Sequence, residues 1–271
     1  MAEKAEGIGI RKAEMDFWST FALAILAGAF IAMGAVFATT VTAGASGHLS
    51  FGVTKLLGGL VFCLGLILVI VAGAELFTGN NLIIMAWADG KVSTARLLRN
   101  WVIVYAGNFV GSVATAIIML VSKQYTFGGG AIGGNALGIA NAKTGLGFVQ
   151  AIALGIFCNA LVCLAVWLCF SARGTTDKIL SILFPITAFV AAGFEHSVAN
   201  MYFISIGLFL KQWASPEFWS VLGKTAADYA NLTWGRFVFA NLLPVTIGNI
   251  IGGAGIVGLI YWFIYLRPKQ S

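Results

Sequence analysis

A glutamate and a histidine stand side by side in the middle of an apolar stretch that runs from about residue 179 to 210. Glu195 and His196 belong to the segment Gly-Phe-Glu-His-Ser-Val-Ala-Asn at 193–200. An ionised side chain at the centre of a membrane helix costs roughly 2.5–3.5 kcal/mol, so such residues usually face a polar cavity and mark a substrate or ion path. Imidazole changes its charge near neutral pH, and it donates a hydrogen bond even when neutral. We therefore predict that His196 stands in the middle of a transmembrane pore for a small anion.

A second carboxylate, Glu75, occupies a matching place in another long apolar stretch. An anion path gains nothing from two exposed carboxylates, so Glu75 and Glu195 are expected to have a structural role. Where a helix is interrupted, backbone N–H groups lose their partners, and a buried carboxylate can accept hydrogen bonds from several of them. The alternative is a cation path in which the two glutamates are the ligands.

Three further polar residues lie inside apolar stretches. Thr78 can offer a hydroxyl opposite His196 if the two halves of the chain are related by symmetry. Asn159 and Asn200 either line the path or hydrogen-bond one helix to another, and the sequence leaves both roles open.

The composition places the chain in a lipid bilayer. Of its 271 residues, 59% are hydrophobic and 10% are charged, whereas soluble domains have about 25% charged residues. The net charge of +6 comes from basic residues scattered over loops and span ends, which favours membrane topology and attraction of anions over nucleic-acid binding. We predict one transmembrane domain, 1–271, without a cleavable signal, because the first apolar run is long enough to remain as a span.

Enzyme and cofactor chemistry find no support in the sequence. A bis-histidine haem needs a second intramembrane histidine, but His48 lies in a loop, and no Gly-x-Ser-x-Gly nucleophile motif occurs. No metal, cofactor or enzymatic activity is predicted. A neutral-solute or cation channel of aquaporin-like build remains an alternative, although Asn-Pro-Ala motifs are missing. The cysteines lack zinc or redox spacing and are expected to be packing residues: Cys63, Cys158, Cys163 and Cys169.

Two of the six apolar stretches are too long for a simple span. A helix crosses the ~30 Å hydrocarbon core with about 20 residues, but the second and fifth stretches have roughly 35 and would reach about 50 Å. We therefore predict two broken spans, each with a non-helical segment at membrane depth, which is tolerated only in protein or beside a wet cavity. The stretches cover approximately residues 17–40, 52–87, 97–122, 147–170, 178–212 and 236–266.

Matches between the two halves predict an internal repeat. Gly-Ala-Glu-Leu-Phe-Thr-Gly-Asn at 73–80 aligns with 193–200 as Gly-x-Glu-x-x-x-small-Asn. Gly-Asn-x-x-Gly follows at 107–111 and again at 248–252. Three spans per repeat force opposite orientations, so we predict a 3+3 inverted repeat with the binding site near the midplane.

The predicted repeats, approximately 17–122 and 147–266, are joined by a loop with a glycine-rich run at 127–134. No Gly-Lys-[Ser/Thr] follows that run, so a flexible connector is expected rather than a phosphate loop.

Ten basic residues, including Lys269, fall on the predicted inner side of the membrane and six on the outer side, which favours cytoplasmic termini. The repeated Gly-x-x-x-Gly spacings, and Gly252 with Gly255, are assigned to close helix packing.

Three segments carry a resemblance to a known family: Leu-Phe-Thr at 76–78, Phe-Glu-His-Ser-Val-Ala-Asn-Met at 194–201 and Pro-Val-Thr-Ile-Gly-Asn at 244–249. With them, the sequence resembles the formate/nitrite transporter family over nearly its whole length. Segments 214–219 and 261–267 resemble the formate branch, which puts the nitrite and hydrosulfide branches second. The resemblance implies an aquaporin-like protomer of six spans in the bacterial inner membrane, a homopentamer with one pore per subunit, and formate or a similar small anion as substrate.

The resemblance also implies roles for single residues. Leu66 and Leu76 with Phe77 would form an inner slit, and Phe62 with Phe189 would narrow the outer side. The segment before the first span is short beside typical formate members, so the sequence leaves open whether an N-terminal helix gates the pore. The chamber between the slits would be flanked by His196 and Thr78, with Asn159, Val162 and Asn200 in its wall and Lys143 near the outer vestibule, where positive potential gathers anions.

Two apolar slits constrain the mechanism. A bare anion loses much solvation in such a slit, whereas a neutral acid loses far less. Few formic acid molecules are neutral at pH 7, because carboxyl groups titrate near pH 4. We hypothesise that formate enters the chamber, bonds to His196 and Thr78, and leaves as the acid after taking a proton.

Overall fold

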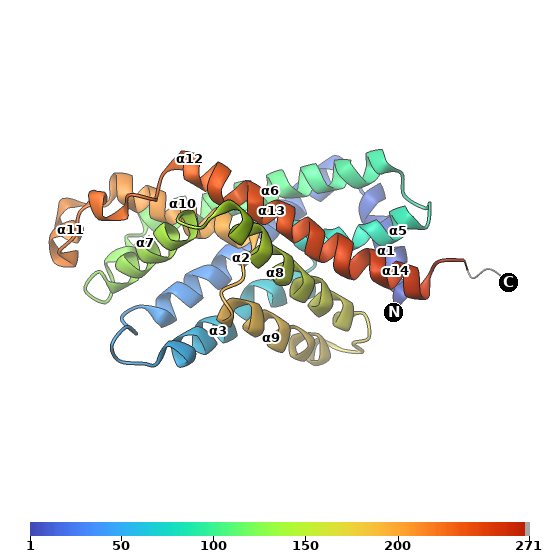
Figure 1. The fold of residues 1–271 in the computed structure, drawn as a ribbon, viewed down its shortest axis with the longest axis horizontal. Helices are drawn as coiled ribbons and strands as arrows, with labels where there is room; N and C mark the ends of the chain where they lie inside the picture. The colour runs from blue at the N-terminus through green and yellow to red at the C-terminus, as the bar shows by residue number, and fades with distance from the viewer. Residues whose placement is uncertain (269–271) are drawn as a thin grey trace.

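The computed structural model describes residues 1–268, and the regular elements in this range are all helical (Figure 1). The prediction of an all-α fold is thereby confirmed. Lys269 and the last two residues of the predicted domain lie outside the described part of the chain. Within residues 1–268, five segments are long and apolar enough to cross a membrane: α2 (Phe17–Thr42), α3 (Phe51–Ala72), α6 (Thr94–Val121), α8 (Phe148–Cys169) and the stretch Ala226–Tyr265.

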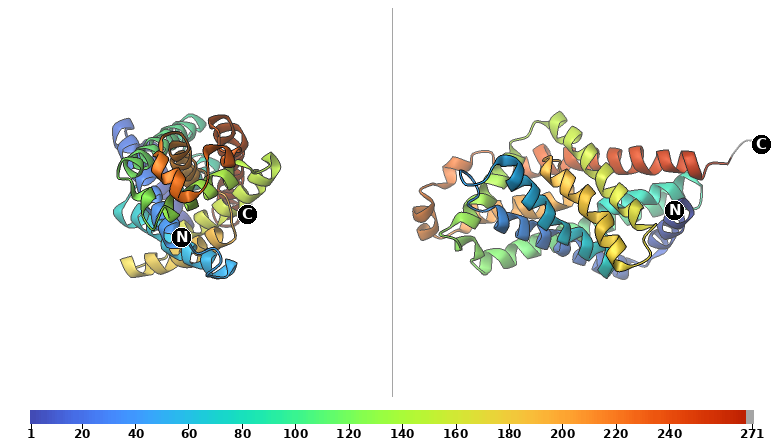
Figure 2. Two further views of the ribbon diagram at one scale, coloured as in Figure 1. Left: turned by 90° about the vertical axis from the view of Figure 1, so that its left-hand side faces the viewer. Right: turned by 90° about the horizontal axis from the view of Figure 1, so that it is seen from below.

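The predicted stretch 178–212 consists of two helices of 17 residues each, α9 (Thr175–Ala191) and α10 (Ser197–Trp213). The helical segments that cover residues 237–265 follow one another without a gap and run along one side of the molecule (Figure 2). The remaining elements are α1 (Ala2–Glu14), α4 (Phe77–Asn80), η1 (Asn81–Ile83), α5 (Ile84–Ala88), η2 (Gln124–Thr126), α7 (Ala131–Thr144), α11 (Pro216–Leu222), η3 (Ala226–Tyr229), α12 (Trp234–Arg236), η4 (Phe237–Leu242), α13 (Leu243–Ile250), η5 (Ile251–Leu259) and α14 (Ile260–Tyr265), of which η4 and η5 are π-helical.

The long apolar helices begin at polar caps. The Asp16 carboxylate accepts a hydrogen bond from the Ser19 N–H at 3.0 Å at the start of α2. Ser50 and Ser93 cap α3 and α6 in the same way. A cap of this kind stabilises a helix by about 1 kcal/mol and sets its first residue, which an unbroken apolar sequence cannot do.

Glycines let α6 approach α2 and let η5 approach α8. A Cβ at Gly111 would overlap the carbonyl oxygen of Ile25, and one at Gly252 would overlap that of Ile156. The predicted packing role of the Gly-x-x-x-Gly spacings is confirmed at these positions. The predicted pairing of Gly252 with Gly255 is wrong, because Gly255 faces open space.

The glycine-rich run at 127–134 is only partly the connector that the sequence predicts. Gly130, with φ of +83°, ends the turn, and α7 begins at the next residue. This helix packs against α10, where Gly207 leaves room for Ala140. Tertiary contact with α10 therefore overrides the low helix propensity of the glycines in its first turn.

The chain is interrupted on the carboxyl side of α3 and of α9. Gly73 and Gly193 take left-handed conformations, with φ of +79° and +74°, which glycine adopts without the steric cost of a side chain. The residues that follow are extended, and the Glu75 and Glu195 N–H groups donate to the carbonyl groups of Leu23 in α2 (3.2 Å) and Leu154 in α8 (3.3 Å). Helix then resumes with α4 and α10.

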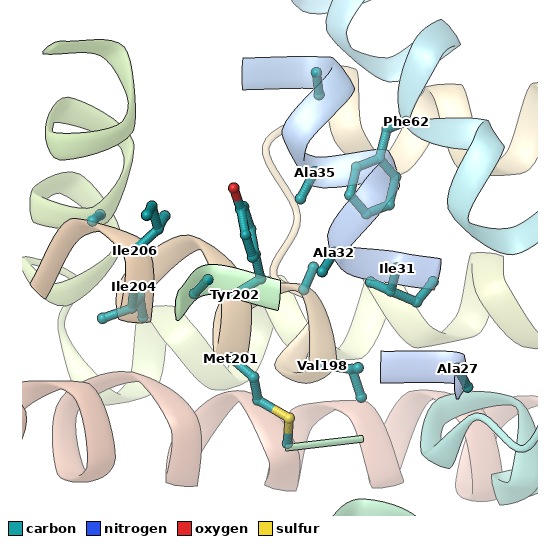
Figure 3. Packing of buried hydrophobic residues seen from close by; sticks show 14 of the residues in the cluster. Ala27, Ile31, Ala32, Ala35, Phe62, Val198, Met201, Tyr202, Ile204 and Ile206 are labelled. Carbon is teal, nitrogen blue, oxygen red and sulfur yellow. The ribbon is translucent and has the colours of Figure 1, made fainter. Parts of the chain in front are cut away.

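The core lies around α10, which is buried on nearly every face. Val198 and Tyr202 belong to the same buried cluster as Ile31 and Ala35 of α2 and Phe62 of α3 (Figure 3). A helix enclosed in this way cannot shift without disturbing several neighbours. The core thus fixes the amino end of α10, where His196 lies.

Candidate transport site

His196 and Thr78 meet in the interior of the helix bundle although 118 positions separate them. The Thr78 Oγ1 and His196 Nε2 atoms are 3.0 Å apart. Thr78 lies in α4, directly after the first interruption, and His196 is the residue before α10. Both side chains are buried. The fold therefore places a hydroxyl against an imidazole at the point where the two interruptions come together.

The hydrogen bonds of His196 determine which ring nitrogen carries the proton. The backbone N–H of Ala199 donates to Nδ1 at 3.1 Å. An accepting nitrogen has no proton in neutral imidazole, so Nε2 carries it and donates to Thr78 Oγ1. The Thr78 hydroxyl hydrogen is then available to a further acceptor. In this state the pair is uncharged and keeps one hydroxyl hydrogen, although the Thr78 side chain is fully buried.

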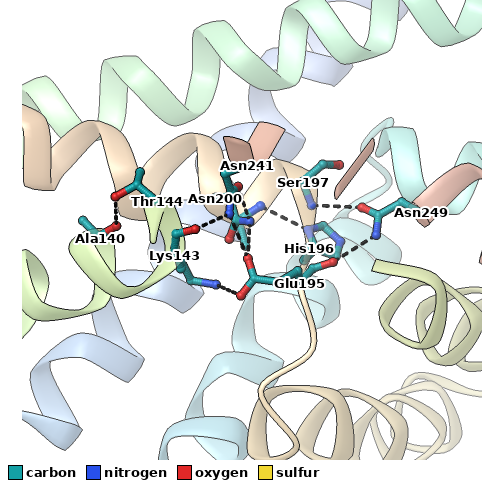
Figure 4. A network of polar contacts seen from close by, with 10 residues as sticks. Ala140, Lys143, Thr144, Glu195, His196, Ser197, Asn200, Asn241 and Asn249 are labelled. Carbon is teal, nitrogen blue, oxygen red and sulfur yellow. Dashed lines mark hydrogen bonds and ion pairs between the residues drawn. The ribbon is translucent and has the colours of Figure 1, made fainter. Parts of the chain in front are cut away.

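Glu195 is the centre of a polar network beside this pair (Figure 4). Its Oε1 accepts a hydrogen bond from Lys143 Nζ at 2.8 Å. Its Oε2 accepts from Asn200 Nδ2 at 2.6 Å and from Asn241 Nδ2 at 3.3 Å. The same Asn241 Nδ2 donates to the Lys143 carbonyl group at 3.0 Å. The ammonium thus compensates a carboxylate whose side chain is only 6% exposed, where an unpaired charge would be costly.

Glu75 has the same arrangement of partners at the first interruption. Lys12 Nζ donates to Glu75 Oε1 at 2.8 Å, and Asn80 Nδ2 donates to Glu75 Oε2 at 2.7 Å. Asn80 Nδ2 also donates to Asn100 Oδ1, and Asn100 Nδ2 donates to the Lys12 carbonyl group at 3.0 Å. Although the segment before the first span is short, it forms helix α1, which packs on η1 and α5 and supplies Lys12. Sequence reasoning missed this lysine, since nothing in a short polar segment marks a pore residue.

The predicted backbone partners of the glutamates are wrong. Among residues 1–268, neither carboxylate accepts a hydrogen bond from a main-chain N–H. At the first interruption an asparagine takes that role: Asn108 Oδ1 accepts from the Phe77 N–H at 2.9 Å. Its Nδ2 donates to the Glu75 carbonyl group at 2.9 Å.

Asn249 bridges the second interruption in the same way. Its Oδ1 accepts from the Ser197 N–H at 2.9 Å, and its Nδ2 donates to the Glu195 carbonyl group at 3.0 Å. A primary amide supplies a donor and an acceptor, whereas a carboxylate only accepts, so one amide satisfies groups on both sides of a break. The repeated Gly-Asn-x-x-Gly motif contained the signal for these two asparagines.

An inner cavity of about 340 Å³ lies beside α1. Leu66 and Leu76, two of the predicted inner-slit residues, line it together with Glu75. Phe77, predicted with them, is buried but does not line this cavity; its ring lies edge-on to Tyr105 of α6, with centroids 4.9 Å apart. The two leucines are therefore part of the apolar wall of the inner cavity, and the phenyl ring lies against α6.

An outer cavity of about 890 Å³ reaches His196 itself. Phe62 and Phe189 line it and meet edge to face, with centroids 5.7 Å apart. Phe189 in turn lies nearly parallel to the His196 ring at 5.9 Å. Lys143 and the Glu195 carboxylate also line this cavity. Charged, aromatic and imidazole groups are thus brought together on one surface.

The residues expected in the chamber wall differ in their positions. Asn200 lines the outer cavity, whereas Asn159 and Val162 line neither of the two cavities. Asn159 Nδ2 donates to Asn81 Oδ1 at 2.8 Å and to the Asn249 carbonyl group at 2.7 Å. Of the two roles that the sequence left open for Asn159, these contacts favour the helix-to-helix link.

Comparison with known proteins identifies the family. The sequence profile described as Formate/nitrite transporter matches residues 1–263. The chain belongs to the formate/nitrite transporter family. It is 46% identical to the formate channel FocA of Escherichia coli K12 over 270 residues, which are 100% of this chain and 94% of the relative. It is 42% identical to FocA of Haemophilus influenzae over 260 residues, which are 96% and 91% of the two chains.

Solved structures of the family share the fold. A structure described as a pentameric formate channel with formate bound is 49% identical, with a TM-score of 0.88 over 93% of this chain and 98% of that one. A structure described as an FNT family ion channel is 29% identical, with a TM-score of 0.82 over 97% and 98%. This formate/nitrite transporter is therefore a multi-pass membrane protein.

Each cavity of this formate/nitrite transporter has two lysines that form no ion pair within residues 1–268. Lys55 and Lys224 line the outer cavity, and Lys4 and Lys178 line the inner one. Lys143, expected to gather anions near the outer vestibule, is instead paired with a carboxylate. Among the lysines that line the two cavities, these four therefore carry a charge that no ion pair within residues 1–268 compensates.

Metal-binding groups are not assembled in the described chain. Residues 1–268 contain no cluster of three or more His, Cys, Asp or Glu side chains that could hold a metal ion. The four cysteines are free and buried among the helices.

Proposed function

We propose that this protein is a membrane channel for formate and similar small monovalent anions, with a pore in each protomer. The contact between Thr78 Oγ1 and His196 Nε2, at the point where the two interruptions meet, carries this proposal. Apolar residues of the predicted slits line a cavity on either side of it, and both cavities carry unpaired lysines. Relatives that match 100% and 96% of the chain are named formate channels.

The matched networks support six membrane crossings in an inverted repeat. In this proposal, α3 with α4 and α9 with α10 are each one interrupted crossing, which adds a sixth to the five long apolar segments. Lys12 and Glu75 have the same side-chain partners as Lys143 and Glu195. The correspondence extends the repeats beyond 17–122 and 147–266, because the two lysines lie in α1 and α7.

Charge and hydration set the proposed transport step. Formate loses most of its solvation between the apolar walls, and the Thr78 hydroxyl replaces part of it with a hydrogen bond. Leaving as formic acid avoids moving a bare charge through the second slit. His196 can give formate a proton only as the imidazolium, which carries N–H at both nitrogens and so must release the Ala199 N–H. Proton transfer from His196 therefore requires that this bond break.

Assembly and location complete the proposal. We propose a homopentamer in the bacterial inner membrane with both termini in the cytoplasm, as the pentameric formate channel and the basic residues suggest. Large apolar side chains of the spans, including Val121 (74% exposed) and Phe184 (77% exposed), would then contact lipid or a neighbouring subunit. An unaccompanied surface of this kind would aggregate in water.

Uptake into proteoliposomes tests both parts of the proposal. Labelled formate should enter vesicles that contain the protein, faster at pH 6 than at pH 8, with nitrite, hydrosulfide and water as competing or parallel substrates. If one of these solutes enters the vesicles and formate does not, the substrate of the channel is that solute rather than formate. His196→Asn should flatten the pH dependence, whereas the loop variant His48→Asn should keep it. An unchanged pH profile in His196→Asn would reject proton transfer from the imidazole and leave the channel function intact.

A further inference from the structure

Phe203 of α10 lines the outer cavity but belongs to none of the motifs that indicated the pore. Its ring lies beneath the Lys143 ammonium, which is 5.5 Å from the ring centroid. An ammonium over an aromatic face is attracted by the ring quadrupole with about 0.5–1 kcal/mol at exposed sites and about 2 kcal/mol when desolvated. Lys143 is therefore held by two partners of different kinds, this ring and the Glu195 carboxylate.

The same ring contacts the predicted outer slit. Phe203 stacks on Phe62 with centroids 6.3 Å apart and an interplanar angle of 17°. From Phe62 the contacts continue through Phe189 to the imidazole. Six residues linked by these contacts, and by the peptide bond between Glu195 and His196, all line the outer cavity: Lys143, Phe203, Phe62, Phe189, His196 and Glu195. Phe203 is the member that joins the charged part to the aromatic part.

We propose that Phe203 is a specificity-determining residue of the outer constriction, which orients the Lys143 ammonium on one side and the Phe62 ring on the other. The inference rests on the proposed channel function. Unlike the carboxylate, the phenyl ring orients the ammonium without neutralising it. The ammonium has three N–H donors and uses one of them for Glu195, so an anion that arrives from the outer cavity meets a further donor whose direction is already fixed, and binding requires less loss of side-chain entropy.

The contact between Phe203 and Phe62 also sets the width of the outer slit. Stacking against Phe203 limits how far the Phe62 ring can tilt, and this ring forms one side of the predicted slit. A larger carboxylate, such as acetate, needs that tilt in order to pass. Phe203 therefore acts on both the affinity for formate and the rejection of bulkier acids.

The inner half has no equivalent contact. In the residues that the structure describes, no aromatic ring lies under the Lys12 ammonium. The effect of Phe203 on formate binding is therefore expected at the outer entrance only, whereas its effect on the width of the outer slit acts on every solute that crosses the slit. This sidedness separates a specific role from general damage to the protein.

The test compares leucine and tyrosine at position 203. Phe203→Leu removes the aromatic face but keeps an apolar side chain, and Phe203→Tyr restores the face. Phe209→Leu is the matched control, because Phe209 lies on the same helix, is buried, and does not line the cavity. The assay is formate and acetate uptake into proteoliposomes of known protein orientation, with folding checked by gel filtration.

Phe203→Leu should raise the half-saturation concentration for outside formate about fivefold, equivalent to ~1 kcal/mol. The ratio of acetate to formate uptake should rise with it, whereas uptake from the inner side should keep its half-saturation value. Phe203→Tyr should stay within about twofold of the unaltered protein, and Phe209→Leu should change neither quantity.

Two results would overturn the inference: an unchanged half-saturation value and acetate ratio in Phe203→Leu, or the same changes in Phe209→Leu. If the leucine variant does not fold, Phe203→Met replaces it, with the same expectations. Absence of formate uptake by the unaltered protein would instead refute the proposed function.

Discussion

Removal of the Lys143 charge tests how far the buried Glu195 carboxylate depends on its partner. Lys143→Met keeps the side-chain length but leaves Glu195, 5% exposed, with only the amide groups of Asn200 and Asn241. Loss of one partner of a buried ion pair costs about 3–5 kcal/mol, because the other charge stays buried and uncompensated. We expect Lys143→Met to lower the free energy of unfolding by an amount in that range.

Glu195→Gln should cost less. The glutamine has nearly the shape of glutamate, and the Lys143 side chain, 17% exposed, can turn its ammonium into the outer cavity. The expected cost is that of one charged hydrogen bond, about 1.5–3 kcal/mol. The double variant has no uncompensated charge, so its loss should be smaller than the sum of the two single losses by about 2 kcal/mol or more.

The double-mutant cycle is measured by unfolding the four proteins in mixed micelles with a rising fraction of SDS, followed by tryptophan fluorescence. Lys12→Met at the inner pair is the matched comparison and should cost less than Lys143→Met, because Lys12 is 26% exposed and water reaches this pair more easily. Strict additivity, or a Lys143→Met protein as stable as the unaltered one, would refute the account of the network.

Three further predictions follow from the helix breaks, the helix contacts and the inner cavity. Asn249→Leu should lower the free energy of unfolding by about 2–4 kcal/mol in the same assay, because the Ser197 N–H and the Glu195 carbonyl group lose their partner; no loss would contradict the bridging role. Gly111→Ala should destabilise by about 1–3 kcal/mol through overlap with backbone. Gly255→Ala, into open space, should be neutral or stabilise by up to about 1 kcal/mol, and equal effects would refute the packing argument. Leu76→Ala should widen the inner cavity, so that acetate added on the inner side inhibits formate transport at a lower concentration, and unchanged inhibition would place the inner barrier elsewhere.

Several features of the fold follow from residue patterns alone. Apolar length and low charge identify membrane helices, because the bilayer removes the alternatives to a hydrogen-bonded helix. The Gly-x-Glu motifs predicted interruptions near residues 73 and 193, and the structure ends α3 at Ala72 and α9 at Ala191. Glycine with positive φ and an intramembrane charge are local signals, and they need no knowledge of partners.

Fewer features of the site could be predicted from the sequence. Glu75 and Glu195 were recognisable as buried carboxylates, but their partners were not, since Lys12 lies in a short polar helix that resembles any interfacial segment. Asn108 was visible as part of a repeated motif, yet its bridging role depends on which backbone groups lie within its reach. Contacts between segments that are far apart in sequence are set by helix packing, on which local patterns give no information.

The sequence by itself determined that this chain is a helical membrane protein with a histidine and two glutamates at points where apolar helices are interrupted. Only the tertiary structure decided that Thr78 bonds to His196, that amides rather than carboxylates bridge the breaks, and that Phe203 lies between Lys143 and Phe62. The physical reason is the difference between local properties of the chain and contacts between distant segments. Insertion energy and backbone conformation depend on each residue and its neighbours in the chain, whereas hydrogen bonds and ring contacts depend on ångström distances that exist only after the helices have packed.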